Sequence, residues 1–197
     1  MLRRLAAVLF VVALAAPGAF AAPPRFAADA RNPPPSTALN VYSTFELAPV
    51  AMAPEVAAHK GNVVAANYLQ VDIDERIPKL IAPWNARAAT AAPRTLVIQP
   101  EVMQIRFITG GKRLFTGSFG GNSWALLRLR LTDKETGQVV AEPQFYQRAF
   151  AMAAGYSLGA ADKLMLARLA DMSASYLKTN FDAPTGSSIT RSPGAMD

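Results

Sequence analysis

The sequence predicts an α+β domain of two layers, with a mixed four-stranded sheet in the order β-α-β-β-β-α and both helices on one face. Three patterns predict this fold. Apolar and polar residues alternate over Ser123–Asp133, as in a strand with one buried face. A polar turn follows this segment and leads into another strand-forming stretch. Two other segments repeat apolar residues every three or four positions, which is the period of an amphipathic helix.

The first part of the domain is expected to contain one strand and one helix. Leu39–Val50 is rich in β-branched and aromatic residues, which favours a strand, and Pro49 marks its end. A helix is expected to begin near Asn62, and its buried face would be formed by Leu69, Ile73, Ile77 and Leu80. Pro78 lies inside this pattern and predicts a kink or a break into two short helices.

Three strands are expected next. Arg94–Thr109 is the first, and Pro100 within it indicates an edge position or a bulge. Ser123–Asp133 and Val139–Met152 are expected to form a β-hairpin whose turn ends at Gly137, a residue that tolerates positive φ.

A second amphipathic helix closes the domain. Apolar residues from Leu158 to Tyr176 follow a helical period, and Ser157 is a candidate N-cap. Because a helix connects the first two strands, these strands are expected to be parallel, with a right-handed crossover. The later strands follow one another closely and should form an antiparallel meander.

The two ends of the chain differ from the domain in composition. Arg3 and Arg4 precede twelve apolar residues, and Ala19 and Ala21 supply the small residues of a cleavage site. Residues 1–21 are therefore expected to be a cleaved secretory signal peptide, with an uncleaved anchor as the alternative. Residues 22–38 are expected to be a Pro- and Ala-rich tether, 39–181 a single α/β domain, and 182–197 a disordered tail.

The composition excludes several classes of function. The 197 residues include no cysteine and one histidine, which excludes disulfides, thiolate or multi-histidine metal sites and a lipid-anchoring cysteine. Removal of Arg3 and Arg4 lowers the net charge from +6 to +4, so nucleic acid is not expected as a partner. We expect a periplasmic protein that is not lipidated, does not span the membrane once processed, and uses no cofactor or metal.

Phe115–Glu142 combines a glycine-rich turn, an alternating strand, an Asp-x-x-Thr-Gly hairpin and a strand that carries glutamate. This pattern resembles lipoprotein-like bacterial envelope families of unknown function. Their fold is similar to that of curli-secretion and transport-auxiliary lipoproteins, and in element order the likeness covers Leu39–Asn180. The resemblance implies an envelope protein without transferable catalytic residues. It also implies, as an alternative, a subunit of an oligomeric secretion or transport accessory assembly.

A glycine-rich segment over residues 110–122 is the first candidate binding site. It holds five of the twelve glycines and indicates either a long flexible hairpin loop or a loop that binds a partner. The partner-binding interpretation uses the basic and aromatic residues Lys112, Arg113, Phe115, Phe119 and Trp124. A phosphate-binding loop is a further interpretation, but it would need Ser or Thr after the lysine and a helix after the loop.

Arginines on the solvent-facing side of the sheet are the second candidate. Arg128 and Arg130 alternate with buried positions, and Arg106 and Arg148 could join them from the flanking strands. Four guanidinium groups on one face would suit carboxylates or phosphates, such as an acidic protein patch or an anionic envelope component. The alternative is a solvated face on which the arginines pair with Glu101 and Glu142.

Catalytic interpretations have less support in the sequence. Asp72, Asp74 and Glu75 form an acidic cluster, which is more typical of a solvated helix surface with Arg76 and Lys79 as ion-pair partners than of a metal site. The single histidine, His59, has no nucleophile motif near it. We therefore expect an exported, non-enzymatic envelope protein that binds a protein or an anionic envelope component. An enzyme of unrecognised type that uses Asp72, Glu75 or His59 is the alternative.

Overall fold

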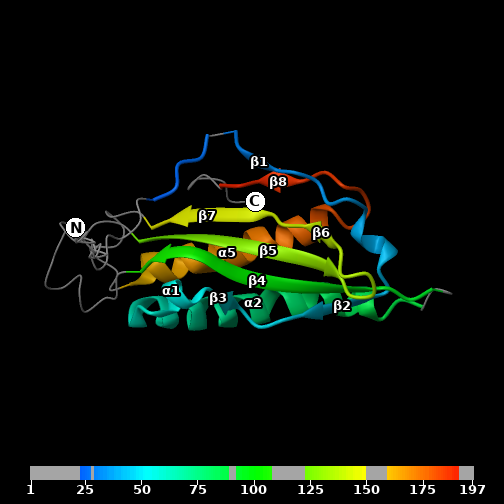
Figure 1. Cartoon of the computed structure of the whole chain (residues 1–197), viewed down its shortest axis with the longest axis horizontal. Coiled ribbons are helices and arrows are strands. Elements are labelled where there is room, and N and C mark those ends of the chain that lie inside the picture. Colours follow the sequence, from blue (N-terminus) through cyan, green and yellow to red (C-terminus); the bar gives the residue numbers. More distant parts are fainter. Residues whose placement is uncertain (1–22, 28, 89–91, 108–122, 150–158, 191–197) are drawn as a thin grey trace, which may run out of the picture.

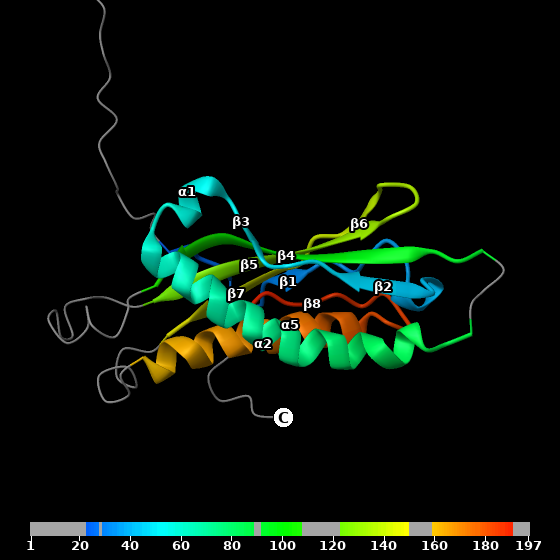
Figure 2. The same cartoon turned by 90° about the horizontal axis from the view of Figure 1, so that it is seen from below.

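A mixed sheet forms one layer of the protein, and two long helices lie side by side on one face of that sheet (Figure 1 and Figure 2). This architecture comes from a computed structural model, which describes residues 23–27, 29–88, 92–107, 123–149 and 159–190. The predicted α+β fold is confirmed, including the mixed sheet and the placement of the helices.

The sheet has six strands, which form four rows. Two short strands, β2 and β3, both run parallel to the long strand β4, and β5 runs antiparallel to β4. The hairpin partner of β5 is divided into β6 and β7, both antiparallel to β5. The strands are β2 (Thr44–Leu47), β3 (Ala51–Met52), β4 (Thr95–Arg106), β5 (Trp124–Asp133), β6 (Val139–Ala141) and β7 (Gln144–Arg148).

Prolines explain why the two outer rows are interrupted. Pro49 lies between β2 and β3, and Pro143 lies between β6 and β7. Proline has no N–H to donate to a ladder, so the predicted strand Val139–Met152 is divided at Pro143. The predicted strand Leu39–Val50 contains β2, which ends before Pro49, and β3 follows it as a strand that was not predicted. The prediction that Pro100 marks an edge strand is wrong, because β4 is an inner strand with neighbours on both sides. Pro100 faces the gap between β2 and β3 on the parallel side, and the bulge lies just beyond it, between Val102 and Gln104.

The longer of the two helices, α2 (Lys60–Asn85), is one helix, so of the two outcomes expected at Pro78, a kink or a break into two short helices, the break is wrong. Proline at this position removes the partner of only one carbonyl, that of Asp74, which lies on the exposed side of the helix where water can bind it. On the other side, Ile73, Ile77 and Ile81 are buried and continue the packing past the proline. Packing of this apolar face offsets the lost hydrogen bond.

Shorter helical elements flank α2, and a second long helix closes the domain. The 3-10 turn η1 (Leu39–Val41) and the short helix α1 (Pro54–Ala57) precede α2. The closing helix is α5 (Ala160–Thr179), and its N-cap is Gly159 rather than Ser157, which lies outside the described residues. The helices α5 and α2 run in the same direction. Lys163 contacts Tyr68, and Asp171, eight residues further along α5, contacts Arg76, which is eight residues further along α2.

The core lies between the sheet and the two helices. Leu127, Leu129 and Leu131 of β5 are fully buried, as the alternation predicts, and they belong to one apolar cluster with residues of both helices. Phe145 packs edge-on against Tyr176, with ring centroids 6.1 Å apart. Burial of each such side chain contributes roughly 1.5–3 kcal/mol, so this face of the sheet is the main source of stability.

Two asparagine side chains cover polar backbone groups at the two edges of the sheet. At β2, the N–H of Phe45 donates to Asn85 Oδ1 at 2.7 Å and its carbonyl accepts from Asn85 Nδ2 at 3.0 Å. At β7, Asn32 makes the same pair of bonds to Gln144, at 2.7 and 2.8 Å. Each amide replaces a neighbouring strand, so these edge positions are not free to pair with another chain.

Segments near both ends of the chain pack on the edge of β7. Strand β1 (Arg31–Asn32) pairs with β8 (Ser187–Ser188), and the N–H of Tyr146 in β7 donates to Ile189 at 2.8 Å. The predictions of a tether over 22–38 and a disordered tail over 182–197 therefore need correction for these residues, which are part of the folded domain. The physical reason is the unpaired outer edge of β7, whose donors and acceptors these segments satisfy.

Candidate functional site

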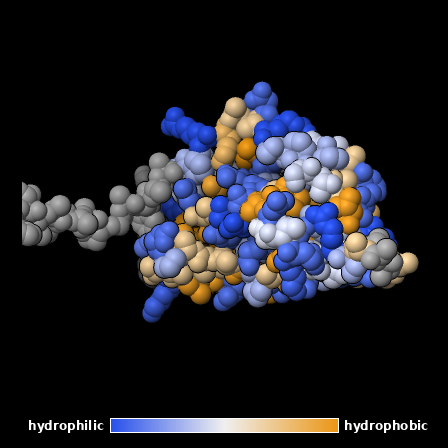
Figure 3. All heavy atoms as spheres, turned by 45° about the vertical axis from the view of Figure 1, so that its right-hand side comes forward, coloured by the Kyte–Doolittle hydropathy of each residue, from blue (hydrophilic) through white to orange (hydrophobic). Residues whose placement is uncertain are grey.

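The outer face of the sheet, opposite the helices, collects the predicted arginines of the described chain. Cross-strand pairing places Glu101, Arg128 and Gln144 in one row, and Arg130 lies opposite Gln99 in the next. Arg106, Trp124 and Arg148 form a further row near one end of β5. In the oblique view of Figure 3, hydrophilic and hydrophobic residues are mixed over the surface, and neither kind forms one large area.

Carboxylates neutralise the two arginines in the middle of this face. Arg128 lies with its NH2 atom 2.5 Å and its Nε atom 3.1 Å from Glu101 Oε2. Glu142 Oε1 lies 3.6 Å from Arg128 and 3.4 Å from Arg130, between the two guanidinium groups. Cross-strand ion pairing with Glu101 and Glu142, which the sequence offered as the alternative, is thus what the structure has at Arg128 and Arg130. The positive charges of Arg128 and Arg130 are therefore partly neutralised by Glu101 and Glu142 within the protein itself.

The row at the other end of β5 has Trp124 at its centre. Arg106 of β4 and Arg148 of β7 are the cross-strand neighbours of Trp124. Trp124 is only 3% exposed, and its indole N–H has no hydrogen-bond partner within the described ranges. Its ring lies 6.4 Å from that of Tyr146. Trp124 is therefore not itself an exposed anchor of this row.

An aromatic side chain from the N-terminal segment lies beside the same row. The ring of Phe26 is 5.5 Å from the ring of Tyr146, and both side chains are half-buried. Aromatic side chains and arginines are the residue types enriched at protein–protein interfaces. The Trp124 row with Phe26 and Tyr146 thus has the composition of such a surface.

Several predicted site residues fall on parts of the chain that the structure does not describe. These are Lys112, Arg113, Phe115 and Phe119 of the glycine-rich segment, together with the cleavage-site residues Ala19 and Ala21. The interpretations that rest on these residues remain predictions.

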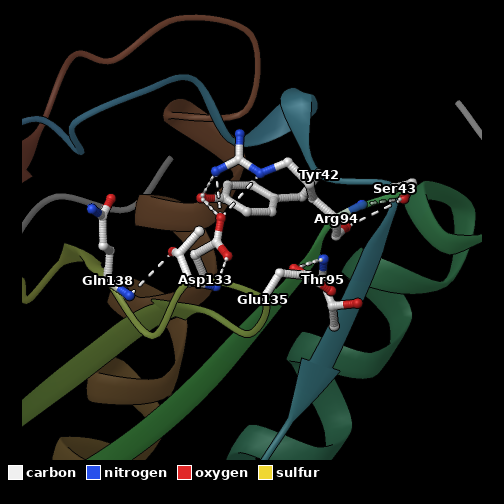
Figure 4. A network of polar contacts seen from close by, with 8 residues as sticks. Tyr42, Ser43, Arg94, Thr95, Asp133, Glu135 and Gln138 are labelled. Atoms are coloured by element: carbon white, nitrogen blue, oxygen red, sulfur yellow. Dashed lines mark hydrogen bonds and ion pairs between the residues drawn. The ribbon is translucent and has the colours of Figure 1, made fainter. Parts of the chain in front are cut away.

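A polar network that the sequence analysis missed lies at the turn end of the hairpin (Figure 4). Asp133, at the end of β5, is 1% exposed and accepts a hydrogen bond from Tyr42 at 3.3 Å and from Arg94 Nε at 3.0 Å. Its other oxygen accepts the N–H of Thr136 at 2.9 Å. The Arg94 guanidinium also lies over the Tyr42 ring, 4.8 Å from its centroid.

This network shifts the acidity of its members. Hydrogen bonds from Arg94, and then from the backbone of Thr136, lower the pKa of Asp133 to about 2. Burial raises the pKa of Tyr42, against the opposing effect of Arg94. The Thr95 N–H donates to Glu135 at 2.9 Å and lowers the pKa of that carboxyl group.

The network joins three separate parts of the chain. Tyr42 precedes β2, Arg94 precedes β4, and Asp133 ends β5. The Arg94 N–H and carbonyl also bond to Ser43, at 3.1 and 3.2 Å. Each polar group thus has partners inside the network, which is the arrangement of a structural clamp rather than of a catalytic group awaiting substrate.

The residues proposed for an enzyme are not brought together. His59 is the N-cap of α2, and Asp72 follows thirteen residues later on the same helix. At 1.5 Å per residue they are about 20 Å apart along the helix axis. Asp72 instead pairs with Arg76 at 3.2 Å, and Arg76 binds Asp171 of α5 at 2.5 Å, so these charges tie the two helices together.

Glu75 completes the predicted ion pairs of this helix, with its carboxylate 3.6 Å from Arg76. The expected pairing with Arg76 is therefore confirmed for Asp72 and Glu75, whereas Asp74 accepts a hydrogen bond from Gln70 and the pairing expected of Lys79 stays a prediction. Over the described part of the chain, no group of three or more His, Cys, Asp or Glu residues is arranged to hold a metal ion. No helix among the described residues is both long and apolar enough to cross a membrane.

Comparisons with known proteins give structural likeness without a family. No protein-family model matches the chain, and no curated protein matches it in sequence. Among solved structures, the hypothetical protein CT253 of Chlamydia trachomatis has a TM-score of 0.40 and 11% identity, over 71% of this chain and 98% of that one.

Two further structures are similar at this level. The PelC dodecamer of Paraburkholderia phytofirmans, as its L103M variant, has a TM-score of 0.35 and 17% identity, over 79% of this chain and 97% of that chain. A protein described as a lipoprotein, from Caulobacter crescentus CB15, has a TM-score of 0.32 and 14% identity, over 69% and 92%. These likenesses assign no family to the chain.

Proposed function

We propose that the protein is an exported, non-enzymatic binding protein of the bacterial envelope, and that it binds an acidic protein partner through the Trp124 end of the outer sheet face. The observation that carries this proposal is the row Arg106, Trp124 and Arg148, in which two arginines are the cross-strand neighbours of a buried tryptophan. The planar fork of arginine suits the carboxylates of an acidic protein surface.

This site is narrower than the one expected from the sequence. Arg128 and Arg130 are paired with Glu101 and Glu142. Substituting these arginines would therefore remove positive charge and also leave the two glutamates without their ion-pair partners. The proposed site is centred on the Trp124 row because the aromatic side chains of Phe26 and Tyr146 lie beside it. Export rests on the signal-peptide pattern of residues 1–21 and predicts a periplasmic product whose first residue is Ala22.

The test is charge reversal with a matched control. The double variant Arg106→Glu/Arg148→Glu changes the net charge by the same amount as Lys79→Glu/Lys178→Glu, whose lysines lie exposed on the helix side of the molecule. Cross-linked envelope proteins captured by the wild type should be captured by the lysine variant and lost from the arginine variant. Circular dichroism of all three proteins checks that each is folded.

Three outcomes would contradict this proposal or a part of it. Equal capture of the same proteins by the arginine variant would exclude the Trp124 row as the binding site. Binding of the wild type to vesicles containing anionic lipid, with no captured protein, would replace the acidic protein by a membrane surface. A periplasmic extract in which the chain still begins at Met1 would contradict cleavage of the signal peptide.

A further inference from the structure

Exposed apolar side chains are concentrated on one surface of the helix layer. Among the described residues, seven large hydrophobic side chains are exposed, and five of them are on α2 and α5. Their exposed fractions range from 37% for Val63 to 56% for Val71. We call this surface the α2–α5 patch; it consists of Val63, Val64, Tyr68, Val71 and Leu164.

The two helices contribute to one continuous surface. Lys163 of α5 lies over the ring of Tyr68, with its Nζ 4.6 Å from the ring centroid, so the two helices meet beside the exposed tyrosine, and Leu164 is the next residue of α5. Figure 2 shows α2 and α5 side by side on the same side of the sheet. A group of exposed apolar residues of this kind is typical of an interaction surface, whereas single exposed residues are not.

Helix stability does not explain these residues. Valine is a poor helix former because its branched side chain loses rotamer freedom against the preceding turn. Three exposed valines within nine residues of α2 therefore weaken the isolated helix and bury little in the monomer. A surface that covers them would offset this cost.

The charges at the two ends of the patch identify the occupant. At 100° per residue, Lys60, Val64, Val71 and Glu75 lie on one face of α2, within an arc of about 60°. Lys60 and Glu75 are both exposed, and they flank the apolar residues symmetrically, four positions outside Val64 and Val71. Opposite charges at equal distances from a centre are complementary to their own copy after a two-fold rotation.

We propose that a second copy of this chain docks on the α2–α5 patch, with α2 packed antiparallel against α2 of that copy. A two-fold axis between positions 67 and 68 places Val64 opposite Val71 of the second copy and Lys60 opposite its Glu75. Both ion pairs then form at the rim of the apolar contact. A parallel arrangement would instead place Lys60 against Lys60 and Glu75 against Glu75.

The neighbours of Glu75 leave its carboxylate available for this contact. Its side chain is 63% exposed, and its own cation, Arg76, is 3.6 Å away. Arg76 is held more closely by Asp171 and Asp72, at 2.5 and 3.2 Å. This inference does not depend on the proposed function, because the Trp124 row lies on the opposite face of the sheet.

Self-association of the purified, exported protein tests the proposal. Sedimentation velocity over a concentration series should show a monomer–dimer equilibrium for the wild type. Val71→Lys should weaken the dimer by about tenfold or more, because it places a charge at the centre of the contact. Val139→Lys is the matched control, since Val139 is 42% exposed but lies in β6, away from the patch. This control should dimerise as the wild type does.

Charge exchange distinguishes a second copy from any other occupant. Lys60→Glu and Glu75→Lys should each weaken the dimer, because each places like charges opposite one another, and the double variant should restore it. A wild type that stays monomeric throughout the series would overturn the proposal. So would a dimer that Val71→Lys leaves unchanged, or a double variant that does not recover the affinity lost by the single variants.

Discussion

Gly186 should be far less tolerant of alanine than Gly137, although both have positive φ. Their φ angles are +73° and +69°, so an alanine at either position carries left-handed strain of about 1–2 kcal/mol. A Cβ at Gly137 would have no neighbouring atom within 4 Å. A Cβ at Gly186 would lie 2.3 Å from the backbone oxygen of Asn32, which has to move.

The magnitude follows from what that movement breaks. Asn32 is held to Gln144 by two hydrogen bonds of 2.7 and 2.8 Å, and each contributes about 1 kcal/mol. Displacing Asn32 by the distance that a Cβ requires loses both. We therefore expect Gly186→Ala to lower the free energy of unfolding by about 3–4 kcal/mol, and Gly137→Ala by about 1–2 kcal/mol.

Urea denaturation followed by tryptophan fluorescence measures both values, and amide hydrogen exchange locates the effect. In Gly186→Ala the N–H of Gln144, which donates to Asn32, should lose protection, whereas Gly137→Ala should leave it unchanged. An equal loss of stability in both variants, with Gln144 protected in each, would refute the reasoning. It would mean that backbone strain alone sets the cost and that β1 is not clamped on Gly186.

Three further predictions concern single polar groups. Because the pKa of Asp133 is about 2 in the folded protein against an ordinary 3.8, stability should fall as pH decreases from about 4 to about 2. Asp133→Asn should flatten this part of the pH profile and also destabilise the protein at pH 7, where Arg94 loses its partner; an unchanged profile would contradict this. Asn85→Ala should lower the free energy of unfolding by about 2 kcal/mol, since both edge groups of Phe45 lose their partner. Thermal unfolding of Asn85→Ala that matches the wild type would contradict this edge role. Burial raises the pKa of Tyr176 to about 12, so stability should fall above pH 10, where the unfolded tyrosine ionises first, and Tyr176→Phe should reduce that fall in alkaline denaturation.

The elements that the sequence predicts well are those with a local physical cause. Alternation along Ser123–Asp133 places Leu127 and Leu129 in the core and Arg128 and Arg130 on the outer face, as the structure confirms. This works because successive strand residues point to opposite sides, whatever the strand packs against. The parallel pairing of β2 with β4 was predictable for a similar reason, because the helix between them requires a crossover.

Errors arose where a local rule competed with packing. Pro78 was expected to kink its helix or break it into two, but α2 does not break there, and its buried face continues past the proline. The proline-rich residues before Leu39 were expected to be a tether. Asn32 in this segment instead bonds to Gln144 at the edge of β7 and is only 5% exposed. A local sequence pattern cannot show which strand will have an unpaired edge, because the edge exists only once the sheet has assembled.

The candidate site also has one part that the sequence predicted and another that only the tertiary structure decided. The sequence alone identified the arginines of the outer face and offered Glu101 and Glu142 as their partners. Only the register of β4, β5 and β7 decided that Arg128 and Arg130 pair with these glutamates and that Arg106 and Arg148 are the cross-strand neighbours of Trp124. A shift of one residue in that register would have reversed the faces.

The sequence by itself determined the signal-peptide pattern, the order of strands and helices, and the face that each β5 residue occupies. These depend on composition and on the period of each element. The tertiary structure decided which polar groups meet, as when Tyr42, Arg94 and Asp133 converge from positions 39 to 91 residues apart. It also decided that Val64 and Val71 stay exposed, because the core offers one helix face to the sheet and leaves the other uncovered.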